Sequence, residues 1–249
     1  MENVDKKNSI WNYISYFIIY SFIGCLLETG YGLMTKGVVE SRQSFLFGPF
    51  CVIYGVGAVL IIKLLSKFKG KWIKLFILSS LLGTAIEFLM SYFGEMIFHF
   101  KWWDYSGMNL NIAGRTCLYF SVMWGALGII LIEFVNPFLN KTLEFIKNNV
   151  NNQVLKISVC LIVGFLIFDA SVSYIGLKSF YAKIVSDFDF DVRNGEYPEI
   201  NIENKLFEED NMLLIYPNMQ IAGTKYNNTY IDSLYKDKKM YYFRVFSKK

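Results

Sequence analysis

The chain has 249 residues, of which 54% are hydrophobic and 23 are phenylalanine. One soluble core of this size would not use so many apolar residues, so the composition excludes an ordinary soluble enzyme and indicates a bilayer as the solvent. The net charge of +4 is small, and the lysines stand in short clusters between apolar stretches, which argues against nucleic acid as a partner. The lipid bilayer is the first partner that the sequence predicts.

Five apolar runs are long enough to cross a hydrocarbon core, and together they predict an all-α polytopic membrane protein. The predicted helices cover about residues 11–34, 45–65, 72–98, 117–139 and 154–177. They define a transmembrane helical domain over residues 1–177 and an extramembrane tail over residues 178–249. The four cysteines lie inside these runs without metal-ligand spacing, so we expect no metal and no cofactor.

Short basic loops predict the orientation in the cell membrane. Five lysines and no acid surround the second turn, which marks that turn as cytoplasmic. They are Lys63, Lys67, Lys69, Lys71 and Lys74. Because successive helices alternate in direction, we expect a multi-pass protein with a cytoplasmic N-terminus and an extracytoplasmic tail.

The first and third helices share an internal sequence similarity. Residues 21–28 read S-F-I-G-C-L-L-E and residues 80–87 read S-L-L-G-T-A-I-E, and farther on Tyr54-Gly55 corresponds to Trp124-Gly125. This pattern predicts two hairpins that form a parallel repeat about an axis along the membrane normal. The alternative is chance similarity, because patterns of small residues recur widely in membrane helices.

The repeat places Glu28 and Glu87 at corresponding depths in two predicted helices. A carboxylate inside a bilayer is costly unless it is protonated, paired or hydrated, so each acid needs a partner. Arg42 and Arg115 are the predicted partners, since a guanidinium group binds a carboxylate through two parallel hydrogen bonds. Asp169 in the fifth helix is a third buried acid, which either bonds nearby serines or joins the same polar cluster.

The third loop, residues 101–115, is dense in aromatic and hydrogen-bonding groups. One interpretation is an aromatic belt that anchors the helix ends, with Arg115 reaching toward headgroups. The other is a binding site for a lipid headgroup or a carrier-linked precursor, in which aromatic rings pack on the ligand while charged groups bind its polar part. The predicted substrate-binding residues are Glu28, Arg42, Glu87, Glu95, Trp102, Trp103, Asp104, Tyr105, Arg115 and Asp169.

An ordered series of motifs recurs along the two hairpins. The series is Gly24-x-x-x-Glu28, Ser41-Arg42, Phe47-Gly48-Pro49, Ile53-Tyr54-Gly55, Glu87, Ser91-Tyr92, Glu95, Trp102-Trp103-Asp104-Tyr105, Asn111, Gly114-Arg115 and Trp124-Gly125. It resembles the bacterial family of putative ABC-transporter type IV, or CmpB-like, permeases over about residues 11–139. The resemblance implies a transport role. Because the chain has no G-x-x-x-x-G-K-[ST] phosphate loop, ATP-driven transport would need a separate ATPase subunit.

Three functions stay open on this evidence. The leading one is a transport or lipid-handling component that binds a lipid or amphiphilic ligand at the polar cluster. The second is a membrane-embedded enzyme that acts on lipid or envelope precursors with Glu28 or Glu87 as a general base. No activated nucleophile accompanies these acids, so the residues favour a non-enzymatic role. The third is a structural or partner subunit of an envelope complex.

The tail is rich in aromatic residues and is not composed like a disordered linker. Strand-like stretches at residues 212–216 and 239–246 predict either a small β-rich module or a cap that adheres to the membrane surface. Asp187, Asp189 and Asp191 alternate with apolar residues, which indicates either a solvated acidic edge or a cation site built from carboxylate oxygens.

Overall fold

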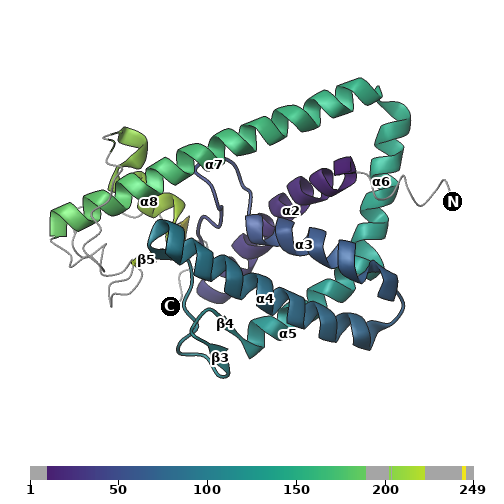
Figure 1. Cartoon of the computed structure of the whole chain (residues 1–249), viewed down its shortest axis with the longest axis horizontal. Helices are drawn as coiled ribbons and strands as arrows, with labels where there is room; N and C mark the ends of the chain where they lie inside the picture. Colours follow the sequence, from purple (N-terminus) through teal and green to yellow (C-terminus); the bar gives the residue numbers. More distant parts are fainter. Residues whose placement is uncertain (1–9, 189–201, 203, 222–242, 245–249) are drawn as a thin grey trace. The chain divides into compact units, whose positions relative to one another are not determined.

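The computed structural model describes residues 10–188, 202, 204–221 and 243–244 (Figure 1). These residues are mostly helical, which confirms the predicted all-α polytopic class. Among them, four helical stretches are long and apolar enough to cross a membrane. They are α2 (Ile10–Lys36), α4 (Trp72–Phe98), the continuous run Leu118–Asn149, and Asn152–Ile184 within α7 (Asn152–Phe188). The chain is a multi-pass membrane protein.

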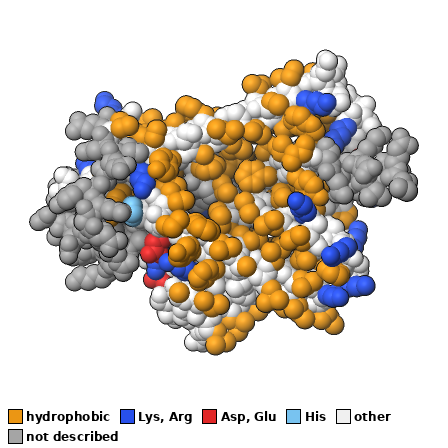
Figure 2. All heavy atoms as spheres, viewed as in Figure 1, with side chains coloured by type: hydrophobic (Ala, Val, Ile, Leu, Met, Phe, Trp, Pro, Cys, Tyr) orange, Lys and Arg blue, Asp and Glu red, His pale blue; other side chains and the backbone are white. Residues whose placement is uncertain are grey.

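Apolar side chains dominate the visible face of the described residues (Figure 2). Large hydrophobic groups stay exposed along the candidate spans, as with Ile73 at 79% and Leu161 at 70%. A soluble protein would hide most of such a surface, whereas lipid tails solvate it at no cost. The exposure therefore agrees with membrane embedding.

The second predicted helix is shorter than expected. Helix α3 covers Val52–Leu65, so the predicted helix is wrong over residues 45–51. Gly48 has φ of 79°, and Pro49 follows it, and both features prevent a helix from forming through this point. The 14 residues of α3 span about 21 Å at the α-helical rise, which is less than the roughly 30 Å hydrocarbon core.

The fourth predicted helix is longer than expected. Helix α5 (Leu118–Ile130) continues through a π-helical turn, η2 (Leu131–Val135), into α6 (Asn136–Asn149). Polar residues after position 139 suggested an end, but they bond to α2 instead. Tyr16 donates to Asn140, and Lys147 donates to Asn12 at 2.7 Å. Helix α7 likewise extends past the predicted end at residue 177.

The described residues divide into two compact units. Unit 1 holds those of Met1–Gly24, Cys51–Met90 and Tyr105–Ile167, and unit 2 holds those of Cys25–Phe50, Ser91–Asp104 and Phe168–Lys249. Helices α2, α4 and α7 contribute residues to both.

Unit 1 confirms the predicted repeat through equivalent close approaches. A Cβ added to Gly24 would overlap the Cβ and Cγ atoms of Tyr54. A Cβ added to Gly83, the corresponding residue of the second hairpin, would overlap the same atoms of Trp124. In each hairpin, the Cβ and Cγ atoms of an aromatic residue therefore pack directly on the backbone of a glycine.

A second pair of contacts repeats in the same way. A Cβ on Gly55 would overlap the hydroxyl of Ser21, and a Cβ on Gly125 would overlap the hydroxyl of Ser80. Chance similarity does not explain four glycines with matched neighbours. Small residues let the helix backbones approach closely in both hairpins.

The two hairpins meet at Tyr54 and Trp124. Their rings stack with centroids 5.6 Å apart. Because these residues occupy corresponding positions, their contact indicates that the axis relating the hairpins passes beside them. The Trp124 ring also lies against Gly57 of α3 and Gly83 of α4, so α3, α4 and α5 come together at this residue (Figure 1).

Unit 2 is built around the second half of α7. Its core contains Leu46, Phe100, Leu177, Phe180, Tyr181, Ile184, Phe207, Met212, Leu213, Tyr216 and Met219. The tail residues enter through a short 3-10 helix, η4 (Lys205–Phe207), and through α8 (Glu209–Ile215). The predicted strand at residues 212–216 is wrong, because burial of Met212 and Leu213 on α7 favours a helix that presents both to one surface.

Strand structure among the described residues is limited to three antiparallel pairs of two residues. β1 (Val38–Val39) pairs with β6 (Phe243–Arg244), and β2 (Phe100–Lys101) pairs with β5 (Gln220–Ile221). β3 (Asn111–Ile112) pairs with β4 (Thr116–Cys117) in unit 1. The first two pairs join the tail to earlier parts of unit 2. Asp189 and Asp191 lie outside the described residues.

Candidate functional site

Glu87 is the centre of a polar set in unit 1. It lies on α4, within a candidate span, and only 4% of its surface is exposed. The Tyr105 hydroxyl donates to Glu87 Oε1 at 3.1 Å, and the Thr116 hydroxyl donates to Oε2 at 2.7 Å. Both carboxylate oxygens therefore accept hydrogen bonds from one loop, which offsets part of the cost of burying the acid.

The loop that supplies these hydroxyls is itself tightly hydrogen-bonded. The Tyr105 N–H donates to the carbonyl of Gly114 at 2.8 Å, and the Gly114 N–H donates to the Asn111 side chain at 3.0 Å. The β3–β4 pair closes the turn, and Thr116 is 0% exposed. The loop thus holds both hydroxyls in place for Glu87.

Aromatic rings surround the same set. Tyr105 stacks on Phe120 with ring centroids 4.7 Å apart. The guanidinium carbon of Arg115 lies 6.0 Å from the centre of the Phe88 ring, within the range of a cation–π contact. Arg115 is half-buried. Its predicted pairing with Glu87 stays a prediction, while the hydroxyl partners are observed.

Arg42 belongs to a different set in unit 2. Its Nη2 lies 2.9 Å from Glu40 Oε2, which also contacts Lys36 at 3.0 Å and Asn218 at 3.2 Å. The predicted pairing of Arg42 with Glu28 stays a prediction, whereas the ion pair of Arg42 with Glu40 is observed. The reason is local, because Glu40 stands two residues before Arg42 and the backbone of Gly32 leaves room for the guanidinium.

Asp169 anchors a third set, also in unit 2. Its Oδ1 accepts the N–H of Phe47 at 3.0 Å and the hydroxyl of Ser173 at 3.3 Å. Ser173 in turn accepts the N–H of Leu46 at 2.8 Å. This confirms the expectation that Asp169 bonds a nearby serine, and it shows that α7 holds the loop before α3.

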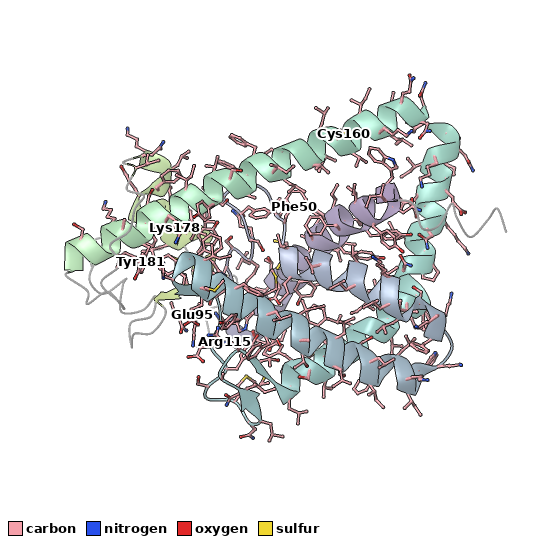
Figure 3. The ribbon with its side chains drawn as sticks, in the orientation of Figure 1. Phe50, Glu95, Arg115, Cys160, Lys178 and Tyr181 are labelled. Atoms are coloured by element: carbon pink, nitrogen blue, oxygen red, sulfur yellow. The ribbon has the colours of Figure 1, made fainter. Side chains whose placement is uncertain are left out.

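The remaining predicted residues have mixed surroundings. Trp102 packs against the ring of Tyr216, with centroids 5.5 Å apart, so it belongs to the core of unit 2. Glu28, Glu95 and Trp103 are half-buried, and Asp104 is exposed. Glu95 extends from the last turns of α4 (Figure 3).

The structure therefore groups the predicted residues into separate sets. Glu87 and Tyr105 are together, whereas Arg42 and Asp169 have other partners. Sequence reasoning missed Thr116 and Glu40, although each stands within two residues of a predicted arginine. The position of Glu40 two residues before Arg42 could have pointed to it, whereas no local signal marks Thr116, whose partner Glu87 lies 29 residues away.

His99 forms a further contact in unit 2. Its ring stacks on Tyr181 at 4.6 Å, and its Nε2 lies 3.4 Å from Lys178 Nζ. Lys178 and Tyr181 both project from α7 (Figure 3). The contact joins the end of α4 to α7.

Tyr216 is the titratable tail residue beside Asp169. Burial raises the pKa of its phenol, the hydrogen bond with Ser173 lowers that pKa by less, and Asp169 raises it further when ionised. The phenol therefore stays neutral at physiological pH.

Comparison with protein families identifies the chain. The family described as putative ABC-transporter type IV matches residues 15–174, which is more than half of the sequence and includes all three polar sets except for tail residues. No curated protein and no solved structure matches the chain. The chain belongs to the putative ABC-transporter type IV family.

Proposed function

We propose that this protein is a transport or lipid-handling component that binds an anionic amphiphile beside the Glu87 set. The observation that carries the proposal is the buried Glu87 carboxylate, which receives hydroxyls from Tyr105 and Thr116 inside an apolar helical unit. Ionisable groups within membrane spans are costly and mark ligand or ion sites as a rule. A loop that is fixed in advance also loses little entropy when a ligand binds.

The ligand class follows from the groups around this set. Arg115 supplies a positive charge, which suits a phosphate or carboxylate headgroup. Phe88 and the stacked pair Tyr105–Phe120 supply aromatic faces for an apolar or sugar-like portion. Glu87 would hold the loop in position and would not contact the anion itself, because its oxygens already accept hydroxyls.

Two further features belong to the same proposal. The predicted topology places this loop on the extracytoplasmic side of the cell membrane. Energy from ATP would come from a separate ATPase subunit, since the chain has no phosphate-binding loop of its own. Family membership supports a transport role without specifying a substrate.

Native mass spectrometry of detergent-purified protein tests the proposal. We expect wild type to retain an amphiphile of discrete mass, and Glu87→Gln and Arg115→Ala to lose it. Glu144→Gln is the matched control, because Glu144 is exposed on α6. Gel filtration must show that all proteins are equally folded. Equal retention by all four proteins, or no adduct on folded wild type, would overturn the proposal.

A further inference from the structure

Asp169 is fully buried, and only one of its two carboxyl oxygens takes part in holding the loop before α3. The residue is 0% exposed. Its Oδ1 accepts two hydrogen bonds, but within the described residues its buried Oδ2 has no hydrogen-bond partner. A buried polar atom with no partner is rare and calls for an explanation.

The groups that interact with Asp169 are neutral. They are the backbone N–H groups of Leu46 and Phe47 and the hydroxyl of Ser173. The titratable group facing it from the tail is Tyr216, a buried phenol. The buried hydrophobic cluster of unit 2, which includes Leu46 and Tyr216, forms the neighbouring core.

An ionised carboxylate in this position would lack a countercharge among the groups that contact it. Such burial strongly disfavours the charged form, whereas a neutral carboxylic acid is tolerated. A proton on Oδ2 leaves Oδ1 free to accept the Phe47 and Ser173 bonds. Both observed hydrogen bonds are therefore compatible with a protonated acid, which also removes the uncompensated charge.

We infer that Asp169 is a proton-binding site and that release of its proton is coupled to release of the loop at residues 45–50 from α7. On release, the O–H bond of the carboxyl breaks, the electron pair stays on Oδ2, and the proton passes to water. The charged product needs hydration, and water reaches it only when the groups that seal it move.

The loop is arranged to move as one piece. Its two bonds to α7 are those of Leu46 and Phe47. The N–H of Ser44, just before the loop, donates to the carbonyl of Phe50 at 2.8 Å and closes the loop on itself. Loss of the two bonds to α7 would leave this closing bond intact, and the packing of Leu46 in the core of unit 2 would still hold the loop. This inference goes beyond the proposed function, because its ligand is a proton and its residues all lie in unit 2.

Infrared spectroscopy of the full chain in lipid nanodiscs tests for the proton. We expect wild type at neutral pH to show the carbonyl stretch of a protonated carboxylic acid, and we expect Asp169→Asn to lose it. Aspartate labelled with ¹³C at the side-chain carbonyl must shift the band in wild type, which assigns it to an aspartate without any mutation. A wild-type spectrum with no label-sensitive band would overturn the inference.

Hydrogen exchange tests the coupling. Because Asn cannot ionise, the amides of Leu46 and Phe47 should lose protection at alkaline pH in wild type but keep it in Asp169→Asn. Equal pH dependence in the two proteins would refute the coupling. Ligand retention at the Glu87 set is measured separately, so either proposal can fail while the other stands.

Discussion

The substitution Gly83→Ala gives a sharp test of the paired-hairpin packing. The added Cβ would overlap Cβ, Cγ and Cδ2 of Trp124, and because the α5 backbone fixes the Cβ, a rotamer change cannot remove the whole overlap. Ala is favoured over Gly in a helix by about 1 kcal/mol. Overpacking in a close-packed interface costs about 1–3 kcal/mol. We expect a cost at the upper end of this range, because the overlap involves the Cβ of Trp124.

The expected net effect is a loss of about 2 kcal/mol in unfolding free energy, which is the overpacking cost minus the propensity gain. Gly164→Ala on α7 is the matched control, because nothing lies within 4 Å of the position of its added Cβ. It should stabilise the protein by up to about 1 kcal/mol. Thermal unfolding in one detergent, followed by gel filtration, compares the two variants.

A compensating swap adds a second check on the same reasoning. A Cβ on Gly128 would overlap Ser79, so Gly128→Ala alone should destabilise the protein, and Ser79→Gly should restore part of the loss. If Gly83→Ala proved as stable as Gly164→Ala, the close approach of α4 and α5 would be wrong.

Three further substitutions probe unit 2. Ser173→Ala leaves a loop N–H unpaired and should cost about 1–3 kcal/mol in denaturant unfolding, whereas Ser158→Ala, at an exposed position of α7, should cost little. Met212→Ala removes a side chain that is 0% exposed and should lower the free energy of unfolding by about 2–5 kcal/mol. Leu214→Ala changes a side chain that is 44% exposed on the same helix and should lower it clearly less. Equal losses of unfolding free energy would refute the packing of the tail in unit 2. The pKa of Tyr216 is raised in the folded state, so the stability that this phenol contributes is present below its unfolded pKa of about 10 and is lost as pH rises through the folded pKa. Tyr216→Phe should therefore resist alkaline unfolding better than wild type. Identical alkaline transitions in the two proteins would contradict this.

The membrane class and the repeat were predictable because both depend on local pattern. Apolar length identified the spans, and the similar segments around Gly24 and Gly83 indicated two corresponding hairpins, whose glycine contacts match in the structure. Helix ends were less predictable. The Gly48-Pro49 turn shortened α3, and bonds such as Lys147 to Asn12 extended a polar helix, because long-range partners outweigh composition at such points.

The partners of the buried acids were the least predictable part of the candidate site. Pairing by opposite charge suggested Arg42 for Glu28, which stays a prediction, and it did not suggest the observed ion pair of Arg42 with Glu40. Neutral groups bind Glu87 and Asp169, namely hydroxyls and backbone N–H groups. A single sequence does not specify which loop atoms reach a helix, since this depends on loop geometry and tertiary packing.

Photo-crosslinking in the native membrane tests most directly whether the Glu87 set binds a defined ligand. A photoreactive phenylalanine analogue would replace Phe88, which faces Arg115, or Phe93, which is 46% exposed on the same helix. The account predicts that position 88 captures one amphiphile of discrete mass, while position 93 captures the general lipid mixture. The same mixture at both positions, or no adduct at position 88, would contradict it.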